Sequence, residues 1–240
     1  MTRTPSFGRL ALVAAVASLA ACSTPLAEAS NSLTVHGAGT APASSAALSA
    51  SRQRSPNPDA QTGGASSVKI RMYALWISAH GDCSVPVLVQ TYGEAGEDKE
   101  FMENPVLFAG QPAVGTYQCV MFRMSDVLRM KPATTFGACI ADAEYAGDIY
   151  RDGESDWKDV ELNSVVGHGT DEIPVDDHVT IFFTRDTAAA RVRGISSNQL
   201  VLLESDLVVP AQSTFYLDAS DAVQTDGTYC GLEKPRTSFE

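Results

Sequence analysis

The sequence lacks the short motifs that identify several common enzyme classes. It has no Gly-x-Ser-x-Gly nucleophile elbow, no His-Glu-x-x-His zinc motif and no Gly-rich phosphate loop. His168 lies beside acidic residues and His80 precedes Cys83 by three positions, but neither spacing by itself sets a nucleophile against a base. The sequence therefore predicts no catalytic residues and ranks an uncharacterised hydrolase third among the possible functions.

Basic residues are scarce. The chain has 17 Lys and Arg against 29 Asp and Glu, which gives a formal net charge of −12. Nucleic-acid phosphates and anionic lipid headgroups are bound mainly through Lys and Arg. This composition argues against nucleic acid as a partner and against electrostatic docking of the chain on a lipid surface.

The N-terminal segment carries a sorting signal. Arg3 and Arg9 precede a short apolar run, Leu10–Ala20. That run is too short to cross a bilayer, because a membrane-spanning helix needs roughly 20 apolar residues. A positive start and small residues after a short apolar run are typical of a secretory signal peptide.

Residues 19–22, Leu-Ala-Ala-Cys, resemble the lipobox of bacterial lipoproteins. The resemblance implies that residues 1–21 are a signal peptide and that Cys22 is acylated, with palmitate among its chains, so that the N-terminal lipid anchors the protein in a membrane. Removing Arg3 and Arg9 with the signal peptide takes the net charge from −12 to −14 (−12 − 2). Ser23 resembles the residue that sends such lipoproteins to the outer membrane of the bacterial cell envelope, which is the expected location.

Residues 22–67 are predicted to comprise the acylated cysteine and a flexible tether. Ser, Ala, Thr, Pro and Gly dominate the segment, and it contains no aromatic residue. A segment of this composition buries too little apolar surface to offset the entropy of ordering it. One folded domain is therefore expected over residues 68–240.

Four cysteines fall in the expected domain: Cys83, Cys119, Cys139 and Cys230. An even number of cysteines in an exported chain favours two disulfides, and four cysteines leave three possible connectivities open. The closely spaced Cys or His pairs of structural zinc sites do not occur.

Short apolar runs, several of them alternating with period two, recur along the expected domain. They lie at residues 68–77, 85–91, 117–124, 178–184, 200–203, 207–209 and 214–217. Gly, Pro, Asp and Asn bound these runs. The pattern predicts a mainly β fold, an antiparallel β-sandwich, with at most a short helix at residues 139–150.

Residues 112–117, Pro-Ala-Val-Gly-Thr-Tyr, precede one of the apolar runs. They resemble the Pro-, Gly- and Tyr-containing entry to a strand in Ig-like and transthyretin-like β-sandwich modules of bacterial surface proteins. The resemblance implies a sandwich fold and carries no implication for function.

A long acidic loop is predicted over residues 142–161. Asp152, Glu154 and Asp156 alternate around a Gly and a Ser within it, and Ca²⁺ takes six to eight oxygen ligands. The spacing departs from that of an EF-hand loop. The favoured interpretation is a solvated loop without a cofactor, which keeps a β protein soluble; a calcium site formed by these three carboxylates is the alternative.

Aromatic residues are interleaved with these acids. Tyr145, Tyr150 and Trp157 would offer flat apolar faces beside carboxylate acceptors, a combination that suits sugar recognition. The sequence thus predicts a lipid-anchored, non-enzymatic interaction or structural module of the cell envelope, whose partner is an envelope protein or a glycan. A calcium- or glycan-binding surface lipoprotein is the alternative function.

Overall fold

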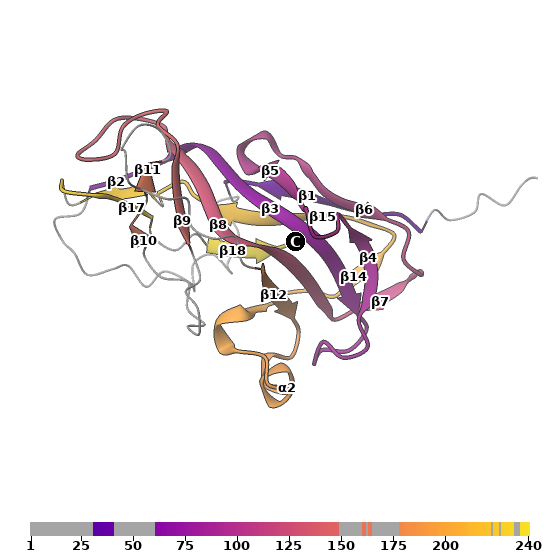
Figure 1. Cartoon of the computed structure of the whole chain (residues 1–240). Helices are drawn as coiled ribbons and strands as arrows, with labels where there is room; N and C mark the ends of the chain where they lie inside the picture. The colour runs from indigo at the N-terminus through magenta and orange to yellow at the C-terminus, as the bar shows by residue number, and fades with distance from the viewer. Residues whose placement is uncertain are drawn as a thin grey trace, which may run out of the picture.

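The computed structural model describes residues 31–40, 61–148, 160–161, 163–164, 178–221, 223–225, 227–232 and 236–240. Within these ranges the chain is mainly β, most strand pairs are antiparallel, and the larger sheets pack against each other (Figure 1). The prediction of a mainly β, sandwich-like fold is confirmed.

Two long strands form the centre of the larger sheet. β3 (Ala65–Ser78) and β8 (Cys119–Pro132) pair antiparallel along their length, and β12 (His178–Thr184) pairs with the first half of β8. Within the described chain this sheet has eight strands; the others are β4 (Val87–Thr91), β5 (Glu97–Glu100), β9 (Tyr145–Asp148), β11 (Asn163–Ser164) and β13 (Leu200–Leu202).

The second layer is a sheet of four strands from distant parts of the sequence. Their order is β18 (Arg236–Phe239), β15 (Ala211–Asp218), β1 (Leu33–Ala38) and β6 (Val106–Gly110). β1 pairs parallel with β15 and antiparallel with β6, so it occupies an interior position.

This position of β1 corrects the predicted tether. Leu33 and Val35 are 1% and 0% exposed, because their side chains alternate onto the face that meets the larger sheet. β2 (Gln61–Gly63) and the start of β3 also belong to the folded part. The folded domain therefore includes residues 31–40 and 61–67, while residues 22–30 and 41–60 lie outside the described residues.

Smaller elements complete the fold. A further four-stranded sheet has the order β10 (Val160–Glu161), β17 (Cys230–Leu232), β16 (Val223–Thr225) and β2. β7 (Gly115–Tyr117) pairs with β14 (Leu207–Val209). Two 3-10 helices, η1 (Phe101–Glu103) and η2 (Ser197–Gln199), lie in connections between strands.

Phenylalanines fill the space between the two layers. Phe122 of β8 stacks on Phe215 of β15, with ring centroids 4.9 Å apart. Phe183 of β12 meets Phe215 edge to face, and Phe239 of β18 lies 5.7 Å from Phe122. Since four of these rings are less than 2% exposed, including Phe108 of β6, the contacts join strands of both sheets into one core.

The helix predicted at residues 139–150 is wrong. Tyr145–Asp148 form β9, which pairs with Val127–Met130 of β8. The open edge of β8 outweighs the weak helical periodicity of this segment, as tertiary context often does. The α-helix of the described chain is instead α2 (Thr187–Val192), whose N-terminus is capped by the carboxylate of Asp186 accepting from Ala189 N at 2.8 Å.

All four domain cysteines are paired, as predicted. Cys83 bonds to Cys119 and Cys139 bonds to Cys230, with Cα–Cα distances of 5.3 and 4.8 Å. The first bond attaches the β3–β4 loop to β8. The second attaches the turn after β8 to β17, and both of its cysteines belong to the main core.

Candidate functional site

The predicted calcium ligands Asp152, Glu154 and Asp156 lie outside the described residues, and so does most of the predicted acidic loop. Residues 145–148 of that segment are a strand, which corrects the expectation of a continuous loop. Across the described ranges, no group of three or more His, Cys, Asp or Glu side chains has the arrangement of a metal site.

The predicted aromatic ligand site is wrong at Tyr145. This residue is 5% exposed, and its hydroxyl accepts from Ile140 N at 3.1 Å and donates to Ala138 O at 3.4 Å. Its ring is therefore part of the core and presents no open face to a sugar. Tyr150 and Trp157 lie outside the described residues.

The predicted lipidation site Cys22 and the residue His168 also lie outside the described residues. None of the described helices is long and apolar enough to cross a bilayer. Cys83 is in a disulfide, so no free thiol lies three residues after His80.

The loop between β3 and β4, residues 79–86, is constrained by a disulfide and several hydrogen bonds, and we call it the disulfide loop. Cys83 is bonded to Cys119, and its backbone N–H donates to His80 O at 3.0 Å. Cys83 and Val85 both have left-handed φ angles, 60° and 49°. A β-branched residue rarely adopts this conformation, so the loop holds Val85 in a strained position.

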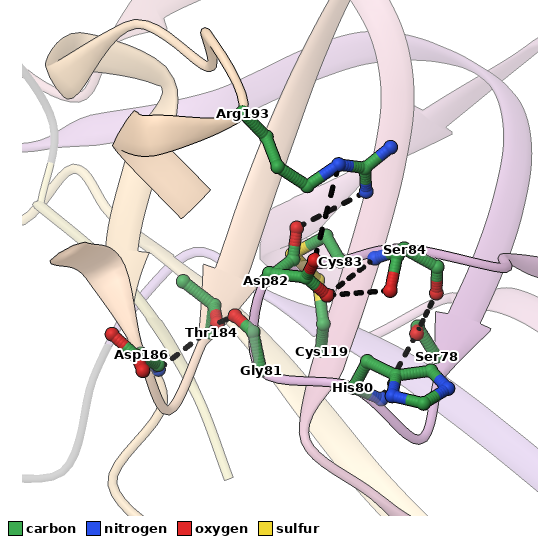
Figure 2. Close-up of a disulfide and its surroundings, with 10 residues drawn as sticks. All are labelled: Ser78, His80, Gly81, Asp82, Cys83, Ser84, Cys119, Thr184, Asp186 and Arg193. Atoms are coloured by element: carbon green, nitrogen blue, oxygen red, sulfur yellow. Dashed lines mark hydrogen bonds and ion pairs between the residues drawn. A yellow bond between two sulfur atoms is a disulfide. The ribbon is translucent and has the colours of Figure 1, made fainter. Parts of the chain in front are cut away.

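Hydrogen bonds fix the base of the disulfide loop to the ends of neighbouring strands (Figure 2). Ser78 Oγ donates to Ser84 O and accepts from His80 N at 3.0 Å. Thr184 Oγ1, at the end of β12, donates to Gly81 O. The loop is therefore tied to β3 and β12 as well as covalently to β8.

Asp82 is bonded to Ser84 within the disulfide loop and to Arg193 at the C-terminal end of α2 (Figure 2). Its carboxylate accepts from Ser84 Oγ at 2.6 Å and from Ser84 N at 3.0 Å. These two hydrogen bonds lower the pKa of Asp82 below its ordinary value of 3.8, with a smaller contribution from the charge of Arg193. Arg193 also donates to Asp82 O at 3.2 Å.

Beneath the disulfide loop lies a small apolar cluster on the outer face of the larger sheet. Cys83, Cys119 and Met121 are buried in it, and Ile195 from the segment after α2 packs against it. Trp76 and Phe182 also pack against this cluster while remaining partly exposed.

Strand register extends this cluster into a row across five strands. Leu88 of β4 pairs with Trp76, Trp76 with Met121, Met121 with Phe182, and Phe182 with Leu200. Residues directly opposite each other in paired strands project from the same face. The five side chains therefore form one apolar row, which we call the outer-face row.

Exposed apolar residues lie at both ends of the outer-face row. Leu88 is 50% exposed at one end, and Val85 of the disulfide loop is 72% exposed. At the other end, Leu202 of β13 is 57% exposed and lies two residues after Leu200 on the same face of the strand. Single exposed apolar residues are ordinary, whereas large contiguous apolar patches occur at contact surfaces.

The sequence alone does not predict this surface. The apolar runs at residues 85–91 and 178–184 predict strands, but only the pairing register makes Leu88 and Phe182 neighbours of Trp76 and Met121. The useful signal was the continuously apolar stretch 74–77, because a strand without alternation has apolar groups on both faces.

The chain matches no family model, no curated protein and no solved structure. Function therefore has to be inferred from the chemistry of the surface itself.

Proposed function

We propose that this protein is a lipid-anchored, non-enzymatic interaction module of the bacterial cell envelope. The Leu-Ala-Ala-Cys quartet at residues 19–22 supports the anchor, with Cys22 as the acylated residue and the outer membrane as the location. The outer-face row supports the interaction, because Leu88 is half exposed and Trp76, Phe182 and Leu200 are partly exposed beside it.

The partner we propose is another envelope protein with an apolar contact surface. Two of the basic residues near the outer-face row are paired with acids of the domain: Arg193 lies 3.9 Å from Asp82, and Arg185 lies 3.3 Å from Asp206. The row thus offers aromatic and aliphatic area rather than a charged field, and aromatic anchors dominate the energetics of most protein interfaces.

Rigidity is the observation that favours a binding role over a purely structural one. The disulfide, the Ser84–Asp82 hydrogen bonds and the strained Val85 backbone hold an exposed apolar side chain in a fixed position. A surface that is already ordered loses less conformational entropy when it binds.

Site-specific photo-crosslinking in cells tests the proposed contact. A photoreactive amino acid at Leu88 should give a discrete adduct with one envelope protein, whereas the same group at Gln212, an exposed position on the other sheet, should not. A second substitution, Phe182→Ala, should reduce the adduct from Leu88 about tenfold by removing an aromatic anchor. Equal labelling from Leu88 and Gln212, or no adduct from either, would refute the proposed surface.

Metabolic labelling with a palmitate analogue tests the anchor separately. Cys22→Ser should lose the label, because a hydroxyl does not form the thioether bond of a lipoprotein, while Cys83→Ser should keep it. Equal labelling of the wild type and Cys22→Ser would refute lipid anchoring and leave the crosslinking result standing.

A further inference from the structure

The outer face of the four-stranded sheet contains a cleft of about 480 Å³. It lies on the layer opposite to the outer-face row, so it is independent of the proposed protein contact. The residues that line it come from β1, β15 and the turn after η1: His36, Ala38, Thr40, Asn104, Thr214 and Tyr216. The volume falls within the range of about 300–1,000 Å³ found for small-molecule sites.

The cleft arises because the interior strand β1 ends in a small side chain, beside a large one on β15. Ala38 of β1 lies opposite Tyr216 of β15 in register, so a methyl group stands next to a phenol ring on the same face. His36 lies opposite Thr214 one step earlier along the strand pair. The sheet surface is therefore hollowed over the end of β1 and walled by β15 on one side.

The turn after η1 provides the other wall. Gly37 N donates to Pro105 O at 2.8 Å and Gly39 N donates to Phe101 O at 2.9 Å, which ties the turn to β1. A Cβ atom on Gly39 would run into Met102 Sδ, so a side chain at this position would displace the side chain of Met102. Asn104 has a left-handed φ of 50° and brings its amide to the rim of the cleft.

Most of the side chains that line the cleft are polar. Among the described residues, no hydrogen bond or ion pair occupies the side chains of His36, Asn104, Thr214 or Tyr216. An imidazole, an amide, an alcohol and a phenol thus converge with their donors and acceptors unused. In the part of the chain that the structure describes, no Asp, Glu, Lys or Arg lines the cleft, although the sequence has 29 acidic and 17 basic residues.

We propose that this cleft binds a neutral saccharide of one or two rings. Sugar hydroxyls are both donors and acceptors and match the uncharged groups of the lining, while the Tyr216 ring offers an apolar face for a pyranose C–H face. A charged sugar has no counter-ion group in the cleft. A purely apolar ligand would leave His36, Asn104 and Thr214 without partners, which costs binding free energy.

Saturation-transfer NMR and calorimetry on the full-length protein in detergent test this proposal. Cellobiose, lactose, maltose and N,N′-diacetylchitobiose serve as neutral probes, and glucuronic acid serves as the charged probe. At least one neutral probe should bind more tightly than glucuronic acid. Tyr216→Ala should weaken that probe about tenfold, and Thr214→Val, which removes a hydroxyl at similar volume, should weaken it about fivefold.

Two control variants separate binding from folding. Tyr216→Phe should keep most of the affinity, because it retains the ring, and Tyr229→Ala should keep all of it, because this partly exposed tyrosine lies outside the cleft. Absence of binding by every neutral probe, preference for glucuronic acid, or equal affinity of Tyr216→Ala and Tyr229→Ala would overturn the proposal. None of these results bears on crosslinking from Leu88.

Discussion

The two main sheets are stabilised in different ways. The eight-stranded sheet is built on β3 and β8, two strands of 14 residues, and Cys83–Cys119 covalently attaches its disulfide loop. The four-stranded sheet gathers β1, β6, β15 and β18 from both ends and the middle of the chain, and neither disulfide has a cysteine in these strands.

This difference accounts for the two kinds of surface. On the larger sheet, the disulfide loop and the segment after α2 cover part of the outer face and hold apolar groups at fixed positions. On the smaller sheet, β1 ends in the small side chain of Ala38 beside Tyr216, and the outer face is hollowed there. The disulfide loop and the segment after α2 form part of the outer surface of the larger sheet, whereas a small side chain shapes the cleft on the smaller sheet.

The largest expected effect comes from breaking the smaller sheet at β1. Val35→Asp would bury an unpaired carboxylate at a position that is 0% exposed, so it should cost about 5 kcal/mol or more of the free energy of unfolding. Thr34→Asp, one residue away on the outer face, should cost about 1 kcal/mol or less. Urea denaturation monitored by circular dichroism measures both. If neither substitution changed the free energy of unfolding, residues 33–38 would be part of a tether and not of the folded domain.

The second prediction concerns the disulfide in the main core. Cys139–Cys230 closes 91 residues, and the chain-entropy model gives about 4–5 kcal/mol for a loop of that length. The double variant Cys139→Ser/Cys230→Ser should lower the melting temperature by about 8–20 °C, at roughly 2–4 °C per kcal/mol. While folded, it should keep the wild-type crosslinking pattern from Leu88, because both cysteines lie away from the outer-face row.

The third prediction concerns the disulfide under the outer-face row. Cys83–Cys119 closes 36 residues, which corresponds to about 3–4 kcal/mol. Cys83→Ser/Cys119→Ser should therefore cost less stability than the loss of Cys139–Cys230 yet reduce the adduct from Leu88 strongly. Calorimetry and crosslinking at a temperature where both double variants are folded separate the two effects. A larger loss of adduct from the Cys139–Cys230 variant would reverse the assignment of roles.

Sequence reasoning found the larger sheet more easily than the smaller one. The runs at residues 68–77 and 178–184 correspond to β3 and β12, because long strands with an alternating pattern carry their own signal. β1 offers only Leu33 and Val35 as large apolar residues, and its burial depends on β15 and β6, far along the chain. The composition of residues 22–67 predicts a tether because the strands that pair with β1 lie far away in the sequence.

The candidate surfaces were less predictable than the strands. The sequence does not determine which cysteines pair, because spacing alone does not distinguish the three possible connectivities. The outer-face row depends on register, which places Leu88, Trp76 and Phe182 side by side from three strands. The cleft depends on the difference in side-chain size between Ala38 and Tyr216, which become neighbours only through strand pairing, and no sequence motif indicates that pairing.

The smallest expected effect is a test of whether the disulfide loop is held locally or from α2. Hydrogen bonds from Ser84 lower the pKa of Asp82 more than the charge of Arg193 does. A carboxyl group whose pKa is lowered on folding stabilises the folded state above pH 3.8, and this contribution is lost as the pH falls through the lowered pKa. In a carboxyl ¹³C NMR titration, Ser84→Ala should raise the pKa of Asp82 clearly, and Arg193→Gln should raise it less. The reverse order would show that α2, rather than the disulfide loop itself, fixes Asp82.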